Sequence, residues 1–257
     1  MNFLLRIYAK LIYLIGDTHF TNRFPWISWS VKKYKVSYDE ILEALPLIKY
    51  GDIGLHRDAG YLSNAFIPGF MKHGWLHTWD TPSRPQIVEA ISDGVVENNA
   101  IKPMLSDYTI ILSPKDVTDE ERKGACKKAQ QVVGVGYDPF FNFDIEEQLI
   151  FYTGTDQDGA RRESLNWGKN AYNYTFSCTE IVSYAWWHKR EELKIKRTKR
   201  LWRDTILADD FLNDAWEIKW VSRSVTPEVA RKLGLHDEGV RMIEQFIAKR
   251  DQAAQAR

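Results

Sequence analysis

The sequence has little cysteine, because only Cys126 and Cys178 occur among its 257 residues. Two cysteines exclude a disulfide-rich scaffold and a cysteine-rich zinc site, and they favour a reduced compartment. The sequence also lacks an excess of charge of one sign, since 35 Lys and Arg are balanced by 35 Asp and Glu. A neutral balance gives no general attraction to nucleic acid or to membranes. The six His include no H-E-x-x-H motif, so no metal site is predicted.

Long hydrophobic runs are missing as well. The apolar stretch at residues 1–15 is interrupted by Arg6 and Lys10, so it is too short and too charged to span a bilayer. No small-residue cleavage site clearly follows, so we predict no signal peptide and a cytoplasmic or peripheral membrane location. Arg6 and Lys10 would share one face of an amphipathic helix. That helix either packs on the domain or contacts a membrane surface, and the sequence leaves both open.

Helical and strand patterns in the rest of the chain predict an α+β fold with an antiparallel sheet. Capping signals place helices after Ser37 and Thr118, and Pro227 suits the first turn of a C-terminal helix. Strand patterns occupy residues 52–56, 73–79, 86–91, 95–96, 108–112 and 216–221, with a hairpin turn at 92–94. We divide the chain into a helical N-terminal extension (1–46), a central domain (47–223) and a C-terminal helical tail (224–257).

The segment around Cys178 is the most informative about chemistry. Ser177 and Glu180 match the S-x-x-E capping box, so Ser177 is the expected N-cap and Cys178 the first helical residue. Free backbone N–H groups and the positive end of the helix dipole favour a thiolate at that position. The same N–H groups can stabilise an oxyanion when a carbonyl is attacked. The alternative is a buried structural cysteine, which is our interpretation of Cys126 in the middle of its predicted helix.

A thiolate nucleophile needs a proton acceptor and donor, usually histidine, and two candidates lie on one predicted strand. His73 and His77 share a face of residues 73–79 but stand roughly 13 Å apart along an extended strand, so only one can meet Cys178. Glu89, on the next predicted strand, can hold an imidazole in one tautomer. Each residue alone also has a purely structural interpretation. The histidine can be a structural residue with its hydrogen bonds made inside the fold, and the glutamate can face solvent.

Several segments, in order, resemble the YiiX-like permuted papain-like amidases of the NlpC-type superfamily. The matching residues are Gly51–Leu55, Tyr61–Gly69, Lys72-His73-Gly74, Ile87–Ala90 with Asp93–Val95, Tyr137-Asp138 with Phe141–Asp144, Cys178–Val182 and Ala208–Leu212. The resemblance spans about residues 48–222 and implies a circularly permuted papain-like catalytic domain, whose antiparallel sheet packs against the nucleophile-bearing helix. It also implies a Cys178–His73–Glu89 triad and favours His73 over His77.

The resemblance further implies a cysteine hydrolase working through an acyl-enzyme. Such an enzyme would be an amidase, an endopeptidase or a lipid acyl hydrolase, acting on peptidoglycan peptides or lipid-linked substrates; an acyltransferase remains open. The mechanism needs no metal or organic cofactor. Tyr137, Tyr174 and His77 are further candidates for an oxyanion or substrate contact. The alternative function is an inert papain-like binding or structural module within a larger assembly.

A basic run at residues 189–203 carries eight Lys or Arg against two Glu. We interpret it either as a solvated face or as a contact for an anionic surface, such as phospholipid or a cell-wall polymer. No motif that reads nucleic acid accompanies it. The predicted partner is therefore an acyl, peptide or lipid substrate, with residues 1–15 and 189–203 as the candidate membrane or polymer contacts.

Overall fold

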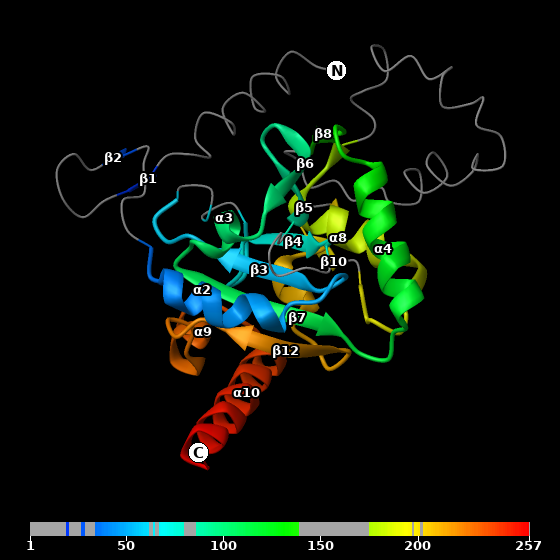
Figure 1. Ribbon diagram of the computed structural model, residues 1–257. Helices are drawn as coiled ribbons and strands as arrows, with labels where there is room; N and C mark the ends of the chain where they lie inside the picture. Colours follow the sequence, from blue (N-terminus) through cyan, green and yellow to red (C-terminus); the bar gives the residue numbers. More distant parts are fainter. Residues whose placement is uncertain are drawn as a thin grey trace, which may run out of the picture.

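A six-stranded antiparallel sheet, in the order β12-β7-β3-β4-β5-β6, forms the centre of the protein (Figure 1). The computed structural model describes residues 34–61, 64, 67–79, 86–138, 175–196, 198–200 and 203–256, and before them only the short strands β1 (His19–Phe20) and β2 (Ile27–Ser28). The strands of the sheet are β3 (Ile53–Arg57), β4 (His73–His77), β5 (Gln86–Ile91), β6 (Gly94–Asn99), β7 (Tyr108–Pro114) and β12 (Trp216–Val221). The predicted α+β class with an antiparallel sheet is confirmed.

Helices and shorter strand pairs surround this sheet. The helices are α2 (Tyr38–Ala44), α3 (Ile101–Met104), α4 (Asp119–Gln131), α8 (Cys178–Trp186), α9 (Pro227–Lys232) and α10 (Asp237–Gln255), with 3-10 turns η1 (Leu45–Leu47), η3 (Trp187–Lys189) and η4 (Ala208–Phe211). Strand β8 (Gly136–Tyr137) pairs in parallel with β9 (Thr175–Phe176), and β10 (Thr198–Arg200) pairs with β11 (Arg203–Thr205). None of the described helices has the length and apolar character needed to cross a membrane.

The two faces of the sheet are buried in separate hydrophobic cores, because successive side chains of a strand point to opposite sides. Leu55, Leu76 and Val88 lie in the core that contains Ile181 and Val182 of α8. Trp75, Ile87 and Ile111 belong to the other core, together with Ile41 and Ala44 of α2. Figure 1 shows α2 and α8 on opposite sides of the sheet. The helix that begins with Cys178 is thus packed directly against the strands that carry His73 and Glu89.

The C-terminal helices pack on the same core as α8. Ala230, Leu235, Val240 and Ile243 are buried in it. Beyond these residues α10 continues away from the sheet, past the edge formed by β12, and carries the C-terminus at its far end (Figure 1).

Local signals predicted several elements correctly. Ser37 and Thr118 cap α2 and α4 as predicted. The hairpin of β5 and β6 has Ile91 opposite Gly94, which leaves Ser92 and Asp93 as its two-residue turn. Gly94 has φ of +107°, and an added Cβ would lie 2.4 Å from the Val135 carbonyl oxygen, so only glycine fits there. The short helix α3 was not predicted.

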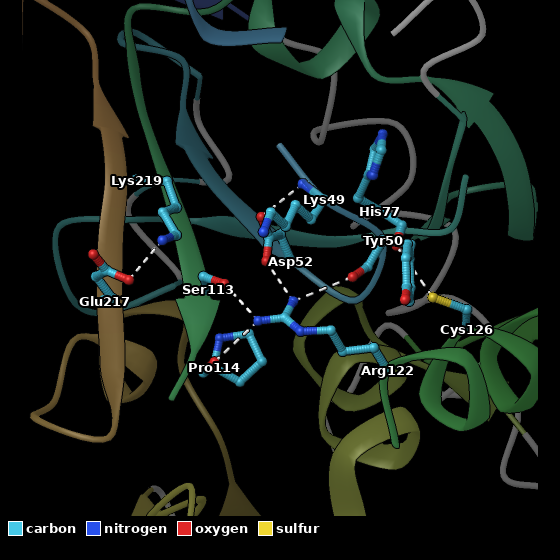
Figure 2. Close-up of polar contacts among 10 residues, drawn as sticks. All are labelled: Lys49, Tyr50, Asp52, His77, Ser113, Pro114, Arg122, Cys126, Glu217 and Lys219. Atoms are coloured by element: carbon cyan, nitrogen blue, oxygen red, sulfur yellow. Dashed lines mark hydrogen bonds and ion pairs between the residues drawn. The ribbon is translucent and has the colours of Figure 1, made fainter. Parts of the chain in front are cut away.

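A buried ion pair fixes the start of β3 to α4, as Figure 2 shows. Arg122 of α4 donates to Asp52 Oδ1 at 2.8 Å, and the Asp52 side chain is completely buried. The guanidinium also donates to Ser113 Oγ and to backbone oxygens of Tyr50 and Pro114. Asp52 Oδ2 accepts the Lys49 N–H at 2.8 Å. This network closes the loop that leads into β3.

We expect Asp52→Ala to lower the free energy of unfolding by about 3–5 kcal/mol, because it leaves a buried guanidinium without its counter-charge. Urea unfolding followed by circular dichroism measures this loss. The double variant Asp52→Ala/Arg122→Met should lose less than the single variant, since it buries no unpaired charge. A loss of under about 1 kcal/mol in Asp52→Ala would mean that the pair contributes no more than a surface ion pair does.

Candidate active site

Cys178 occupies the first position of α8, as its sequence predicts. Ser177 is the N-cap, and Glu180 Oε2 accepts the Ser177 backbone N–H at 2.5 Å, which is one half of the predicted capping box. All residues of α8 are buried, and Cys178 itself is 2% exposed. The helix therefore cannot shift without disrupting the core, so the sulfur is held at a fixed position at the positive end of the helix dipole.

His73 and Glu89 form the second part of the site. His73 Nε2 lies 2.9 Å from Glu89 Oε2, and Asn98 Nδ2 donates to the other carboxylate oxygen at 2.7 Å. Glu89 pairs with Trp75 in the β4–β5 ladder. Trp75 is two residues after His73 on β4, so the side chains of Glu89 and His73 project from the same face of the sheet. Because Glu89 engages Nε2, the other ring nitrogen, Nδ1, is left for the sulfur.

The sulfur of Cys178 meets the start of β4. The His73 ring hydrogen-bonds the Cys178 side chain, and the backbone N–H groups of Gly74 and Thr179 also donate to the sulfur. Sγ lies 3.9 Å from the Lys72 carbonyl oxygen. The β4–β5 pairing ends at Trp75 and Glu89, which leaves the Gly74 N–H available to the sulfur. The structure thus brings together the three residues of the predicted triad.

The charges of the site favour a thiolate–imidazolium pair. Burial alone would raise the pKa of Cys178, but the His73 charge, its hydrogen bond and the two backbone donors lower it overall. Burial alone would lower the pKa of His73, but the Cys178 thiolate and Glu89 raise it to about 10. The pKa of Glu89 falls to about 2 despite its burial, because His73 and Asn98 donate to it. Glu89 is therefore ionised across the physiological range.

Glu180, in the first turn of α8, is an acidic residue close to Cys178. It is 2% exposed, and burial followed by repulsion from Asp138 raises its pKa well above the ordinary value, with Cys178 adding to the rise. Glu180 Oε2 accepts the Ser177 N–H and so caps the start of α8. The raised pKa disfavours the ionised form of Glu180, which would repel a thiolate at Cys178.

A second imidazole, that of His56, lies next to the His73 ring. His56 stands opposite His73 in the β3–β4 ladder, and the two ring centroids are 4.7 Å apart. Burial and then the charge on His73 lower the pKa of His56 to about 3, so His56 is neutral. His56 was not predicted as a site residue, because the alternation within each strand does not show which strands pair.

The remaining candidates are placed as follows. His77 lies at the opposite end of β4, where its carbonyl oxygen accepts the Gly51 N–H at 2.8 Å and the Cys126 thiol at 3.4 Å, so the structure does not bring it to Cys178. Tyr137 lies on β8 and pairs with Phe176 of β9, and Phe176 is two residues before Cys178 in the sequence. Tyr174 and residues 1–15 are outside the described part of the chain, as are residues 197, 201 and 202 of the basic run.

The described part of the basic run is largely paired with carboxylates. Lys189 contacts Glu121 and Glu192, and Lys194 contacts Asp214. Arg190 lies over the Trp187 ring and contacts Glu191 at 3.5 Å. Three of the eight basic residues predicted for a polymer contact are therefore already paired with carboxylates within the described residues up to 196.

Glu89→Gln should lower kcat/KM by about 10-fold, because a neutral amide orients His73 but stabilises the imidazolium less. Since the Glu89 carboxylate raises the pKa of His73, its loss lowers that pKa and moves the alkaline limb of the activity profile to lower pH. A pH profile of kcat/KM measures both effects. Glu97→Gln, on the exposed side of the same hairpin, is the matched control. An alkaline limb that stays in place in Glu89→Gln would contradict this role.

Known proteins show only a distant structural similarity to this chain. No protein-family model matches the chain, and no curated protein matches it. Among solved structures, it is similar to the metalloprotein YiiX of Escherichia coli O157:H7, with 11% sequence identity and a TM-score of 0.43 over 66% of this chain and 95% of YiiX. This is a distant link to a YiiX-like fold, and neither the papain-like class nor the permutation follows from it. Among the residues described for this chain, no group of three His, Cys, Asp or Glu side chains could hold a metal ion.

Proposed function

We propose that the chain is a cysteine-dependent acyl hydrolase with a Cys178–His73–Glu89 triad. One observation carries the proposal: His73 hydrogen-bonds Glu89 through Nε2 while its ring also hydrogen-bonds Cys178 at the start of α8. Nucleophile, base and orienting carboxylate in this relation are the signature of covalent acyl transfer. The base precedes the nucleophile in the chain, which supports a circularly permuted papain-like fold.

The proposed reaction starts from the thiolate. Cys178 Sγ attacks the carbonyl carbon of an amide, ester or thioester, and the electron pair of the C=O bond moves to the oxygen. The free N–H of Cys178 at the helix start stabilises this oxyanion, and Tyr137 is the candidate for a second donor. His73 gives its proton to the leaving group as the bond to carbon breaks, and a thioester remains on Cys178. A water molecule then attacks the thioester carbon while His73 takes its proton. The C–S bond breaks, the carboxylic acid leaves, and Cys178 is again a thiolate.

The substrate class follows from the resemblance rather than from the geometry. Peptidoglycan peptides and lipid-linked amides or esters are the proposed substrates, with an acceptor hydroxyl or amine replacing water if the enzyme is an acyltransferase. Residues 1–15 and residues 189–203 are the proposed contacts with a membrane or anionic polymer. The proposed location is cytoplasmic or at the membrane surface.

An inert papain-like module is the second candidate, and one observation favours it. Cys178 is only 2% exposed, so a substrate carbonyl has little direct access to the sulfur in this conformation. In that case the ion pair would be a structural feature of the core, and the chain would act as a binding or structural part of a larger assembly.

Labelling with an electrophilic acyl mimic, followed by peptide mass spectrometry, separates the two functions. Cys126 is an internal control, because its 5% exposure and a pKa raised by burial to about 12 make it an unreactive thiol. The hydrolase predicts rapid, selective labelling of Cys178 at neutral pH. Equal or greater labelling of Cys126, or none at Cys178, would support the inert module.

A further inference from the structure

Residues Ile206–Asp209, which lead from β11 into η4, contact both halves of the proposed active site. In the sequence, Ile206 follows Cys178 by 28 residues and His73 by 133 residues. Ile206 and Asp209 are buried, with exposures of 1% and 4%. We call these four residues the positioning segment.

Asp209 holds the backbone that delivers His73. Its Oδ2 accepts the Phe70 N–H at 2.5 Å, and its Oδ1 accepts the Met71 N–H at 2.7 Å. Gly69 allows this approach, since its φ is +90° and an added Cβ would lie 2.5 Å from Asp209 Oδ2. Lys72 follows Met71 directly, and its carbonyl oxygen is 3.9 Å from Cys178 Sγ. The carboxylate therefore sets the backbone position immediately before the base.

Ile206 holds the first turn of the nucleophile helix. The Thr179 hydroxyl donates to the Ile206 carbonyl oxygen at 2.7 Å, and both groups are buried. Thr179 follows Cys178 directly, and its backbone N–H is one of the donors to the sulfur. The same short segment thus connects to the residue after the nucleophile and to the backbone just before the base.

The C-terminal helix anchors this segment in turn. His236 caps α10 by accepting the Gly239 N–H on Nδ1 at 3.1 Å. With Nδ1 acting as acceptor, Nε2 carries the ring proton and donates to the Asp209 carbonyl oxygen at 2.9 Å. The backbone of Asp209 is therefore held by an element that packs on the main core.

We propose that the positioning segment sets the distance between Cys178 and His73, with Asp209 and Thr179 as positioning residues. This inference rests on the proposed hydrolase function. The ion pair depends on the sulfur, the imidazole and the Gly74 N–H meeting within hydrogen-bond range, and displacement of reacting groups by about 1 Å can cost about 100-fold in rate. A carboxylate that accepts two adjacent N–H groups fixes both the position and the direction of the Phe70–Met71 backbone.

Two independent variants remove one contact each. Asp209→Asn has one amide oxygen in place of two carboxylate oxygens, so the Phe70 and Met71 N–H groups cannot both be satisfied. Thr179→Val keeps the shape of the side chain but cannot donate to Ile206, whereas Thr179→Ser keeps the hydroxyl. Asp214→Asn makes the same chemical change as Asp209→Asn at an exposed position and serves as the matched control. Circular dichroism and thermal unfolding establish that each variant is folded.

The readout is the rate of Cys178 alkylation by iodoacetamide as a function of pH, which needs no knowledge of the substrate. We expect Asp209→Asn and Thr179→Val to slow alkylation at neutral pH by about 10-fold or more and to shift its pH midpoint upward, because less of the thiol is ionised. Thr179→Ser and Asp214→Asn should keep the wild-type profile. With a substrate in hand, the loss should fall on kcat rather than on KM.

The outcomes distinguish this inference from the function on which it rests. A wild-type Cys178 with the pH profile of an ordinary thiol overturns the proposed hydrolase. The positioning role alone is overturned by a different result. In that case the alkylation midpoint of wild-type Cys178 lies at low pH, and the folded Asp209→Asn and Thr179→Val variants have the same midpoint. Variants that lose thermal stability without any change in the alkylation profile would show that the contacts are merely structural, which also contradicts the proposal.

Discussion

Cys178→Ser should lower kcat/KM by at least about 10,000-fold while leaving the fold intact, since removing a catalytic nucleophile costs on this order in related chemistry. The replacement changes one buried atom, from sulfur to oxygen. His73 stabilises a thiolate at this site, but a serine hydroxyl is far too weak an acid to ionise beside the same imidazolium. The variant should therefore unfold like the wild type and fail to form an acyl-enzyme.

The control for this prediction is Cys126→Ser. Cys126 is buried on α4, with its sulfur 3.4 Å from the His77 carbonyl oxygen and away from the triad. Its replacement should leave turnover at the wild-type level. Retention of substantial activity in a folded Cys178→Ser variant would mean that Cys178 is not the nucleophile.

His73→Asn has the second largest expected effect, a fall in kcat/KM of about 1,000-fold or more. Asparagine is uncharged, so it removes both the proton donor for the leaving group and the main attraction that lowers the pKa of Cys178. The Cys178 thiol should then titrate at a higher pH. Burst kinetics and thiol titration measure the two effects separately.

The two large effects should not add. Because Cys178 and His73 act as one unit, the double variant should be hardly worse than Cys178→Ser alone. His77→Asn is a suitable comparison, since His77 lies on the same strand but at the end near Cys126. Loss of activity in His77→Asn equal to that in His73→Asn would contradict the assignment of the base.

Local sequence patterns were sufficient for the parts of the site that depend on neighbouring residues. The S-x-x-E box predicted the N-cap and the position of Cys178, because capping is decided within one helical turn. Glu89 was predicted because β4 and β5 are consecutive in the sequence and pair directly. Strand alternation alone could not choose between His73 and His77, which lie on one face. The family resemblance favoured His73, and the packing of α8 against the start of β4 places His73 next to Cys178.

Contacts between distant segments were not predictable from these patterns. Asn98, the second partner of Glu89, is a nearer residue on the same hairpin. The two-residue turn at Ser92–Asp93 fixes the register of β6, so the sequence could have identified Asn98 as a partner. Phe70 and Asp209 are 139 residues apart, and no periodicity connects them. The pairing of β12 with β7 is equally non-local, so the order of the sheet had to come from the structure.

The central claim, that Cys178 is held as a thiolate by His73, is tested most directly by titrating the ultraviolet absorbance of the thiolate. The difference between wild type and Cys178→Ser isolates Cys178 from Cys126. The predicted curve shows Cys178 ionised already at neutral pH, well below the value of about 8.5 for a free cysteine, with the His73 imidazolium persisting to about pH 10. A Cys178 thiol that titrates at or above about pH 8.5 would contradict the account.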